Sequence, residues 1–509
     1  MTMTMTVDPA TMVPPSQRFI VLATVSATTM LYAMAITVAN VVLPQMRGAL
    51  SATPDQVAWV ITFNLVATAV MTPISGWLSN RFGRRNVLLL GTVGFTIASV
   101  LCGLADSLEA LVFYRILQGA FGAPLVPVSQ AIILDTFPRK EHSMATALWG
   151  VGVCMGPIIG PTIGGAIAEE YSWRWVFFML VPFGVLTFGA IWMFVKRRPV
   201  RPPSPPLDWL GFLALAAALA AFQFMFDRGE RNSWFESPET IVECTVGFLA
   251  VYIFLVHIST SARPFIRPAL FLNRNYTIGL ILAFMFGMLN VAPLVLIPSM
   301  LQELRGYPDS TIGILLAIRG AGNLISFLLV IRMAQWNVHA TLAFGFLCQA
   351  VSGYALAQYD VNLTYFGVAW TGALQGLGIG MSWVPLTLIM FSTIKPDFLD
   401  EASAVFHMFR NFASSLFISI CVAVVIRSTF VNSVELGMPL SEFSKILTLP
   451  WITGVLDLGT VEGLSATSAE IKRQAAMIGY INAFRLYAII AIIPLPLLWL
   501  VRMPKEETP

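Results

Sequence analysis

The chain has 509 residues, of which 57% are hydrophobic and only 11% are charged. A soluble domain carries about 25% charged residues, so this composition excludes water as the solvent for most of the chain and indicates a lipid bilayer instead. The net charge of +3 is too small to indicate a nucleic-acid partner. The five cysteines lie in separate apolar runs, which argues against a disulfide framework and a zinc site.

The first 18 residues form a polar tail that lacks the apolar core of a signal peptide. Because a spanning helix needs about 20 mainly apolar residues, the chain predicts 14 spans, six before and eight after a basic, proline-rich linker at 196–207. The first six lie near 19–43, 57–78, 86–105, 109–134, 143–168 and 175–195. The other eight lie near 208–226, 240–259, 276–300, 311–332, 339–357, 365–391, 402–426 and 477–501. The sequence therefore predicts an all-α polytopic membrane protein.

The charges between the spans predict its orientation. Thirteen Lys and Arg residues fall in short loops on the side of the N-terminus and five in short loops on the other side, so the positive-inside rule places both termini in the cytoplasm. The stretch 427–476 before the last span is polar and about 50 residues long, and loops of that length are usually functional or disordered. We expect it on the outer side, where a partner protein can reach it.

The turn after the second span, residues 76–85, reads GWLSNRFGRR. Two glycines bracket a tight turn, and its arginines can reach helix ends or acids on neighbouring spans. A basic loop alone often only determines topology, but both glycines at this spacing make the motif fairly specific. We predict a conformational switch here, formed by Gly76, Asn80, Arg81, Gly83, Arg84 and Arg85.

The fourth and fifth spans carry two further motifs. Arg115 and Gln118 lie three residues apart in YRILQG and so share one face of a helix. An arginine inside the membrane is costly unless it faces protein or water, so Arg115 is either functional or a buried structural group. The fifth span is dense in Gly and Pro, which allow close helix packing and kinks; its predicted switch residues are Gly156, Pro157, Gly160, Pro161, Gly164 and Gly165.

Together these motifs resemble the major facilitator superfamily. Residues 76–85 are similar to its signature loop G-x-L-a-D-r-x-G-r-[KR], and residues 115–119 resemble its fourth-helix R-x-x-Q-G. The fifth span looks like the antiporter motif G-P-x-x-G-x-x-x-G-G, which occurs in exporters rather than importers. Residues 37–44, TVANVVLP, resemble the first-span ending of the 14-span drug:proton antiporters.

This resemblance implies two six-helix bundles, 19–195 and 260–501, with two inserted helices at 208–259 and cytoplasmic tails at 1–18 and 502–509. It also implies a multi-pass protein of the inner membrane that exports small amphipathic compounds by alternating access. Such a multidrug efflux pump uses the proton gradient and no cofactor. The implied partners are a periplasmic adaptor protein and an outer-membrane channel.

Two positions depart from the family pattern. The Asp of the signature loop is Asn80 here, which weakens or reroutes its interdomain ion pair, and the Asp common in the first span is Ala35. A proton-coupled exporter needs a titratable group linked to the conformational change, and the N-terminal bundle has no deep carboxylate. His407 is a candidate replacement because His titrates near neutral pH, although a lone His is more often a structural hydrogen-bonding group.

Polar residues within the spans are the candidates for substrate binding and coupling. His407, Arg410 and Asn411 share one helical face, as do Arg319 and Asn323. Arginines without a deep carboxylate are compatible with an anionic or neutral substrate. The full set of candidates is Thr37, Asn40, Asn64, Arg115, Gln118, Arg319, Asn323, Gln375, Trp383, His407, Arg410 and Asn411.

Other functions stay open at this point. The chain is compatible with a dedicated exporter of one anionic or neutral compound, such as a fatty acid, siderophore or metabolite. It is also compatible with an uncoupled or non-transporting membrane receptor. The sequence has no convergent set of nucleophile, acid and metal ligands, so we do not expect an enzyme, and it has no G-x-x-x-x-G-K-[ST] loop for ATP.

Overall fold

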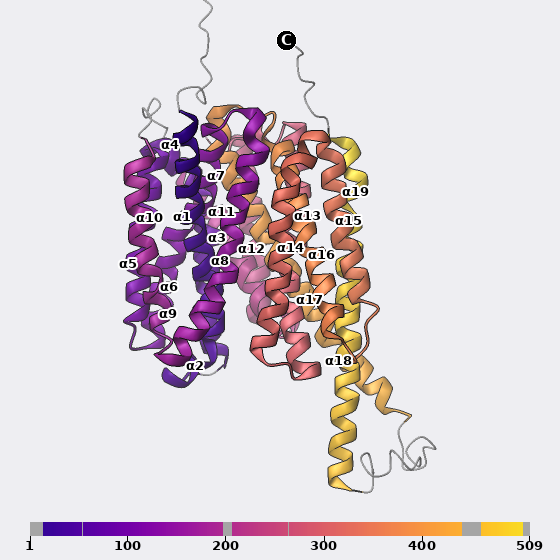
Figure 1. The fold of residues 1–509 in the computed structure, drawn as a ribbon. Helices are drawn as coiled ribbons and strands as arrows, with labels where there is room; N and C mark the ends of the chain where they lie inside the picture. The colour runs from indigo at the N-terminus through magenta and orange to yellow at the C-terminus, as the bar shows by residue number, and fades with distance from the viewer. Residues whose placement is uncertain (1–13, 53, 197–205, 263, 440–459, 502–509) are drawn as a thin grey trace, which may run out of the picture.

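The computed structural model describes residues 14–52, 54–196, 206–262, 264–439 and 460–501. These residues form helices joined by turns, with no strand among them, and the long helices run side by side in one bundle (Figure 1). Large apolar side chains remain exposed along many of them, as expected where lipid rather than water surrounds a protein. The predicted all-α polytopic fold class is therefore confirmed.

The N half consists of the helices before the proline-rich linker. Its second predicted span is broken: α3 and α4 meet at Pro73 with a bend of 55°, because proline interrupts helix hydrogen bonding. The helices are α1 (Pro15–Val41), α2 (Leu43–Ala49), α3 (Pro54–Met71), α4 (Ile74–Phe82), α5 (Arg84–Gly103), α6 (Leu108–Gly122), α7 (Leu125–Thr136), α8 (His142–Glu170), α9 (Trp175–Phe178) and α10 (Leu180–Phe194).

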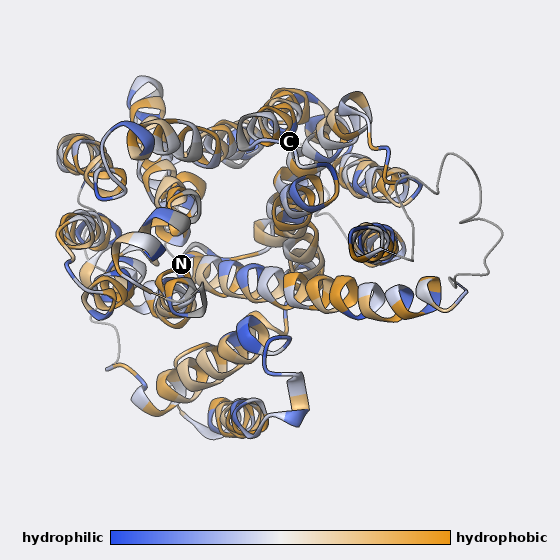
Figure 2. Ribbon diagram, turned by 90° about the horizontal axis from the view of Figure 1, so that it is seen from below, coloured by the Kyte–Doolittle hydropathy of each residue, from blue (hydrophilic) through white to orange (hydrophobic). Residues whose placement is uncertain are grey.

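Two helices, α11 (Trp209–Arg228) and α12 (Pro238–Thr260), follow the linker and lie to one side of the two larger groups (Figure 2). Helix α12 packs on α11 and exposes most of its apolar side chains. Helix α11 contacts both halves, because Thr62 of α3 donates a hydrogen bond to Asp227 and Gln223 donates one to Ser415 of α17 at 2.6 Å. The inserted pair therefore covers the seam between α3 and α17.

The C half contains the longest helices of the molecule. Helix α17 has 39 residues and α18 has 32, and both project beyond the other helices at one end (Figure 1). The helices are α13 (Arg274–Arg305), α14 (Asp309–Trp336), α15 (Val338–Leu356), α16 (Tyr365–Phe391), α17 (Leu399–Gly437), α18 (Val461–Ile492) and α19 (Pro494–Leu497).

The number of spans is close to the predicted 14. In the described residues twelve helices are long and apolar enough to cross a membrane, and the bent pair α3–α4 raises the number to 13. The remaining predicted span corresponds to α15, which packs against α16 and α18 but falls outside this set. The polar residues His339, Gln349 and Ser352 lower the mean hydropathy of α15. That α15 crosses the membrane therefore stays a prediction.

The stretch 427–476 is not a continuous loop, in contrast to the sequence-based expectation. Helix α17 continues to Gly437 and α18 begins at Val461, so much of the stretch is helical; residues 440–459 lie outside the described part. Polar residues gave the stretch the composition of a loop, but the helices extend through it regardless. We call residues 427–437 and 461–476 the arm.

The described chain begins at α1 and ends after α19 on the same end of the bundle (Figure 1). Arg274, at the start of α13, donates a hydrogen bond to the carbonyl of Leu500 there. The turn between α4 and α5 lies at this end too. We call this end the termini face and the end that carries the arm the far face.

Candidate gate and substrate pathway

The turn between α4 and α5 joins the two halves at the termini face. Gly83 has a φ of +84°, a conformation that favours glycine, and it directs the next residue, Arg84, toward α17. Arg84 forms a bidentate ion pair with Asp400, with nitrogen–oxygen distances of 2.7 and 2.9 Å. Its third contact is to Asp135 at the end of α7, at 2.5 Å. One guanidinium therefore binds a carboxylate from each half, and we call this cluster the gate.

A close helix approach supports the gate. A Cβ atom on Gly76 would lie 2.9 Å from the Cα atom of Glu401, so only glycine lets α4 pack directly on the start of α17. Glu401 in turn accepts a hydrogen bond from the backbone of Arg267, which precedes α13. Asp400 and Glu401 lie in the first turn of α17, where the positive end of the helix dipole stabilises their negative charges.

The turn holds three further predicted switch residues with polar side chains, Asn80, Arg81 and Arg85. In the described residues Asn80 has no hydrogen-bond partner, and Arg81 lies in the last turn of α4. Arg85 donates a hydrogen bond to the carbonyl of Trp192 at 2.7 Å and lies over its ring. Asn80 has no charge with which to form an ion pair, and at this turn Arg84 and Asp400 join the two halves instead.

Behind the gate, α7 and α17 share a buried polar contact. Ser403 donates a hydrogen bond to the carbonyl of Pro127, and His407 Nε2 lies 2.7 Å from Gln130 Oε1. Both His407 and Gln130 are only 1% exposed. The His407 Nδ1 and Gln130 Nε2 atoms have no partner among the described residues. Such unsatisfied buried groups are costly.

Aromatic rings surround His407. The ring centroid of Phe406 lies at 5.0 Å, that of Trp383 at 6.0 Å and that of Trp149 at 6.5 Å. Trp149 comes from α8 in the N half and the other two from the C half. The histidine therefore lies in an apolar seam between the halves rather than in water.

Arg410 lies one turn deeper on α17. Its guanidinium donates two hydrogen bonds to Asn411 Oδ1 and lies 5.2 Å from the centre of the Trp383 ring. In the described residues no carboxylate pairs with it. A cavity of about 10 Å³ beside it, room for about one water molecule, is lined by both halves: Tyr32, Thr68, Thr72, Ala123, Val126, Pro127, His407, Arg410 and Asn411.

Arg115 and Arg319 lie in separate, fully buried networks, one in each half. Arg115 donates to Gln118 and to the carbonyl of Val60, and Asn64 donates to the Arg115 carbonyl at 2.8 Å. Arg319 donates to Gln375 at 2.8 Å and to the carbonyl of Asn290. Side-chain amides and backbone carbonyls satisfy both guanidiniums. The sequence grouped these residues with Arg410, but the structure does not bring the three arginines together.

Helix α8 packs on both halves. Toward α1, a Cβ atom on Gly156 would lie 2.7 Å from the Ala33 side chain, and Gly160 and Gly164 face Thr37 and Val38 in the same way. Toward α14, Asn323 donates a hydrogen bond to Cys154 Sγ at 2.8 Å. Pro157 and Gly165 also lie in α8, whereas the side chains of Pro161 and Asn40 lie outside the described part.

Some residues of this pathway were missed by the sequence analysis. Asp400 was not among the candidates, although two consecutive acids at the start of a predicted span are a signal for a helix N-terminus. Gln130 and Tyr32 were missed because a single glutamine or tyrosine in a span has no distinguishing pattern. Ala35, which replaces the usual Asp, is 2% exposed and packs in the core.

Comparisons with known proteins are consistent with this arrangement. The family model described as "Major Facilitator Superfamily" matches residues 25–418. The chain belongs to this superfamily. Its predicted fold, two bundles of membrane helices with an inserted pair, is thereby confirmed, and it is a multi-pass membrane protein of a superfamily of transporters that work by alternating access.

Among sequence relatives of this superfamily member, "Multidrug export protein EmrB" of Escherichia coli K12 is 30% identical over 499 residues, 96% of each chain. "Fatty acid resistance protein FarB" of Neisseria gonorrhoeae is 30% identical and covers 92% of this chain and 93% of its own. Among solved structures, the human organic anion transporter MFSD10 aligns with a TM-score of 0.63 at 14% identity, over 96% of this chain and 100% of its own. The last likeness concerns the fold alone.

Proposed function

We propose that the protein is a secondary active exporter of small amphipathic compounds, of the multidrug efflux type. The observation that carries this proposal is the gate, in which Arg84 and Asp400 join the two halves at one end of the bundle. An alternating-access transporter needs a closed end that can open. The relatives named as multidrug export proteins, which match 96% of the chain, support the direction of transport.

The charges of the loops support an orientation with both termini in the cytoplasm. The termini face would then be cytoplasmic, the gate would close the cytoplasmic side, and the membrane would be the inner membrane. In this orientation the N-terminal bundle comprises 19–195, the inserted helices 208–259 and the C-terminal bundle 260–501. The arm would project into the periplasm.

A narrower substrate class is favoured by Arg410. A buried charge is costly without a partner, and hydroxyl and amide groups from both halves surround this one. An amphipathic carboxylate would pair with Arg410 and place its apolar part against Trp383. The name of the relative FarB, a fatty acid resistance protein, is consistent with this second candidate function, a dedicated exporter of an anionic compound.

Coupling to protons would use His407, a titratable group buried at the seam between the halves. Its hydrogen bond to Gln130 crosses from one half to the other, so protonation of the ring changes a contact that opening must break. No cofactor is required by this scheme. The proton gradient would supply the energy.

The arm supports a proposal for protein partners. Apolar residues remain exposed on it beyond the other helices, including Phe430, Val431 and Val461. Exposed apolar surface outside the membrane marks protein contact sites. A periplasmic adaptor protein, leading to an outer-membrane channel, would bind there.

Transport by purified protein in liposomes tests the function. With a pH difference across the liposome membrane, an amphipathic carboxylate should move toward the more acidic side, even against its own concentration gradient. The Arg410→Gln variant should lower that rate at least tenfold, while Arg427→Gln, an exposed arginine on the same helix, should not change it. A receptor would move nothing. A strong preference for permanently cationic dyes would contradict the anionic substrate class.

A further inference from the structure

The inserted pair, α11 and α12, is joined to the segment before α13 by one carboxylate, that of Asp208. Its Oδ1 atom accepts a hydrogen bond from the backbone of Gly211 at 3.0 Å and lies 2.8 Å from His257 Nε2 of α12. Its Oδ2 atom accepts a hydrogen bond from the backbone of Phe265 at 3.1 Å. The Asp208 side chain is 10% exposed. We call residues 264–270, which lead toward α13, the bridging segment.

Asp208 does more than cap α11. An N-cap needs one acceptor, and serine or asparagine supplies it as well as aspartate. The contacts with His257 and Phe265 are additional to the cap. They fit tightly, because a Cβ atom on Gly211 would lie 2.5 Å from Asp208 Oδ2 and 3.3 Å from His257 Cδ2. Only glycine at position 211 therefore leaves room for the carboxylate in this place.

The bridging segment contacts both sides of the gate. Phe265 packs edge-to-face on Phe212 of α11, with ring centroids 5.7 Å apart, in an apolar cluster that includes Ile74 of α4. The backbone N–H of Arg267 donates a hydrogen bond to Glu401 at the start of α17, and Arg267 Nε lies 3.6 Å from Glu401 Oε2. Helix α4 belongs to the N half and α17 to the C half, so the segment lies across the seam.

The bridging segment has little freedom to change shape. Pro264 and Pro268 restrict its backbone, because the proline ring fixes φ. Ile266 is 2% exposed and Leu270 is 3% exposed, and both pack in the large apolar core. A shift at the start of the segment is therefore passed on to Arg267.

Glu401 connects the segment to the gate. It is adjacent to Asp400, which forms the ion pair with Arg84, and its Cα atom lies against Gly76 of α4. Glu401 is only 9% exposed, so withdrawal of the Arg267 N–H would take a donor from a buried carboxylate, which is costly. The first turn of α17 is thus best placed when the bridging segment is held.

We propose that Asp208 is a positioning residue of the gate. It holds the bridging segment against Glu401 and so couples the inserted pair to the ion pair between Arg84 and Asp400, without contacting either residue. This inference rests on the gate of the proposed function and goes beyond it. It gives α11 and α12 a part in closing one end of the transporter, in addition to covering the seam.

Cysteine labelling of the full-length protein tests this role. Ser403→Cys, buried behind the gate, reports opening when it reacts with a water-soluble maleimide in a background with the native cysteines replaced. Asp208→Ser keeps an N-cap for α11 but cannot hold His257 and Phe265 as well. The closed state loses contacts with a charged group, so labelling should become roughly threefold faster or more.

A second variant separates positioning from the stability of α11. Alanine favours a helix over glycine, so Gly211→Ala does not weaken the helix itself. Its methyl group displaces the Asp208 carboxylate, so labelling of Ser403→Cys should again become faster. A role of Asp208 in helix capping alone would leave this variant with the labelling rate of the parent.

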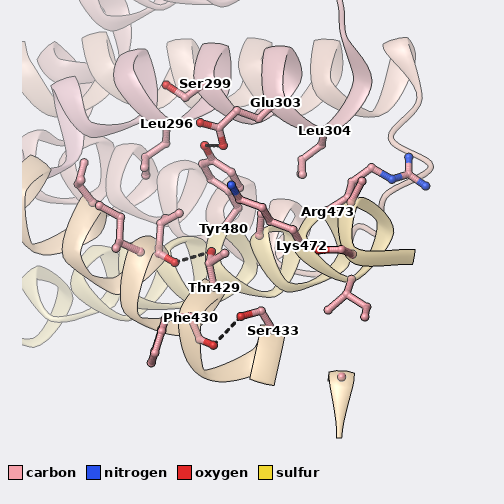
Figure 3. A pocket seen from close by; sticks show the side chains of 18 of the residues that line it. Leu296, Ser299, Glu303, Leu304, Thr429, Phe430, Ser433, Lys472, Arg473 and Tyr480 are labelled. Carbon is pink, nitrogen blue, oxygen red and sulfur yellow. Dashed lines mark hydrogen bonds between the residues drawn. The ribbon is translucent and has the colours of Figure 1, made fainter. Parts of the chain in front are cut away.

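The control changes a similar hydrogen bond at the other end of the molecule. There α13, α17 and α18 surround a cleft of about 1310 Å³, in which the Tyr480 hydroxyl donates a hydrogen bond to Glu303 at 3.0 Å (Figure 3). Tyr480→Phe also removes a donor from a carboxylate, but it should leave the labelling rate unchanged. An equal increase in this control would overturn the inference.

Asp400→Asn, which breaks the gate directly, separates the two levels of the proposal. Faster labelling in Asp400→Asn with unchanged rates in both Asp208→Ser and Gly211→Ala would overturn the role of Asp208 and leave the gate in place. Unchanged labelling in Asp400→Asn would overturn the gate itself, and the positioning role with it.

Discussion

Arg84 is the residue on which the closed state of the gate depends most directly. The side chains of Arg84, Asp135 and Asp400 are at most 15% exposed. Removing one partner of a buried ion pair typically costs about 3–5 kcal/mol, because the remaining charge is left uncompensated. Exposed pairs contribute about 0–1 kcal/mol. The gate should therefore respond strongly to substitution.

The Asp400→Asn variant should raise the population of the open gate. The uncharged amide cannot form the ion pair with Arg84, so the closed state loses its main contact between the halves. Labelling of Ser403→Cys, which is buried behind the gate, should become at least tenfold faster in a background with the native cysteines replaced. Glu470→Gln, which breaks the exposed pair with Arg473, is the control and should leave labelling unchanged.

The His407→Gln variant tests the proposed proton coupling. Glutamine can still hydrogen-bond to Gln130 but cannot titrate near neutral pH, so export should continue with a flattened pH profile. Transport rates measured across the pH range give the comparison, with His339→Gln, a half-buried histidine at the termini face, as the control. A profile like that of the wild type would place the coupling at another residue.

Sequence reasoning at the residue scale was limited by distance along the chain. The partner of Arg84 lies 316 residues away, and no local pattern connects the two. The direction of a side chain was equally hidden, because the spacing of Arg115 and Gln118 indicates a shared helical face but not which neighbour that face contacts. The close approach at Gly76 and the turn at Gly83 were predictable because such positions require glycine.

At the scale of elements, α8 packs closely against helices of both halves. Its glycines contact α1 in the same half, while Cys154 and Ile158 contact α14 in the other half. One face therefore fixes α8 within the N half, and the opposite face is part of the seam that has to slide.

A matched pair of glycine substitutions tests this packing. Gly156→Ala should destabilise the protein by about 1–3 kcal/mol because the added methyl overpacks the contact with α1. Gly189→Ala in α10, where nothing lies within 4 Å, should stabilise it by up to about 1 kcal/mol, as alanine favours a helix over glycine. Thermal unfolding in detergent gives both values, and equal shifts of the same sign would contradict the proposed α8–α1 contact.

Hydropathy predicted the positions of most helices well, because each span must satisfy its backbone hydrogen bonds internally in lipid. It was less informative where neighbouring protein replaces lipid, as for α15 with Gln349 in its centre. It also missed the arm, since a polar helix outside the membrane has the composition of a loop. Val431 lies in the part of α17 that forms the arm, and Leu464 lies in the corresponding part of α18.

At the scale of the whole molecule, polar contacts join the two halves from the gate to the middle of α8. The deepest of these polar contacts is that of Asn323 with Cys154. Helix α11 adds bonds to α3 and α17 on another side. The halves therefore cannot move apart without changing contacts at several separate places.

An Asn323→Cys variant should allow the halves to be locked. The new thiol faces Cys154 across the seam, so oxidation should link α8 to α14 and stop transport, and a reductant should restore it. The wild type, which has Cys154 alone at this place, treated with the same oxidant, is the control. Continued transport by the cross-linked protein would show that the seam does not open during the cycle.

Because Arg84 binds a carboxylate from each half, opening of the gate separates it from only one of the two. Asp135 belongs to the same half as Arg84 and moves with it, whereas Asp400 moves away with α17. The guanidinium is therefore never stripped of an anion, and only one carboxylate changes its surroundings in each cycle. Water entering the crevice would solvate that carboxylate, which offsets part of the free energy lost with the ion pair.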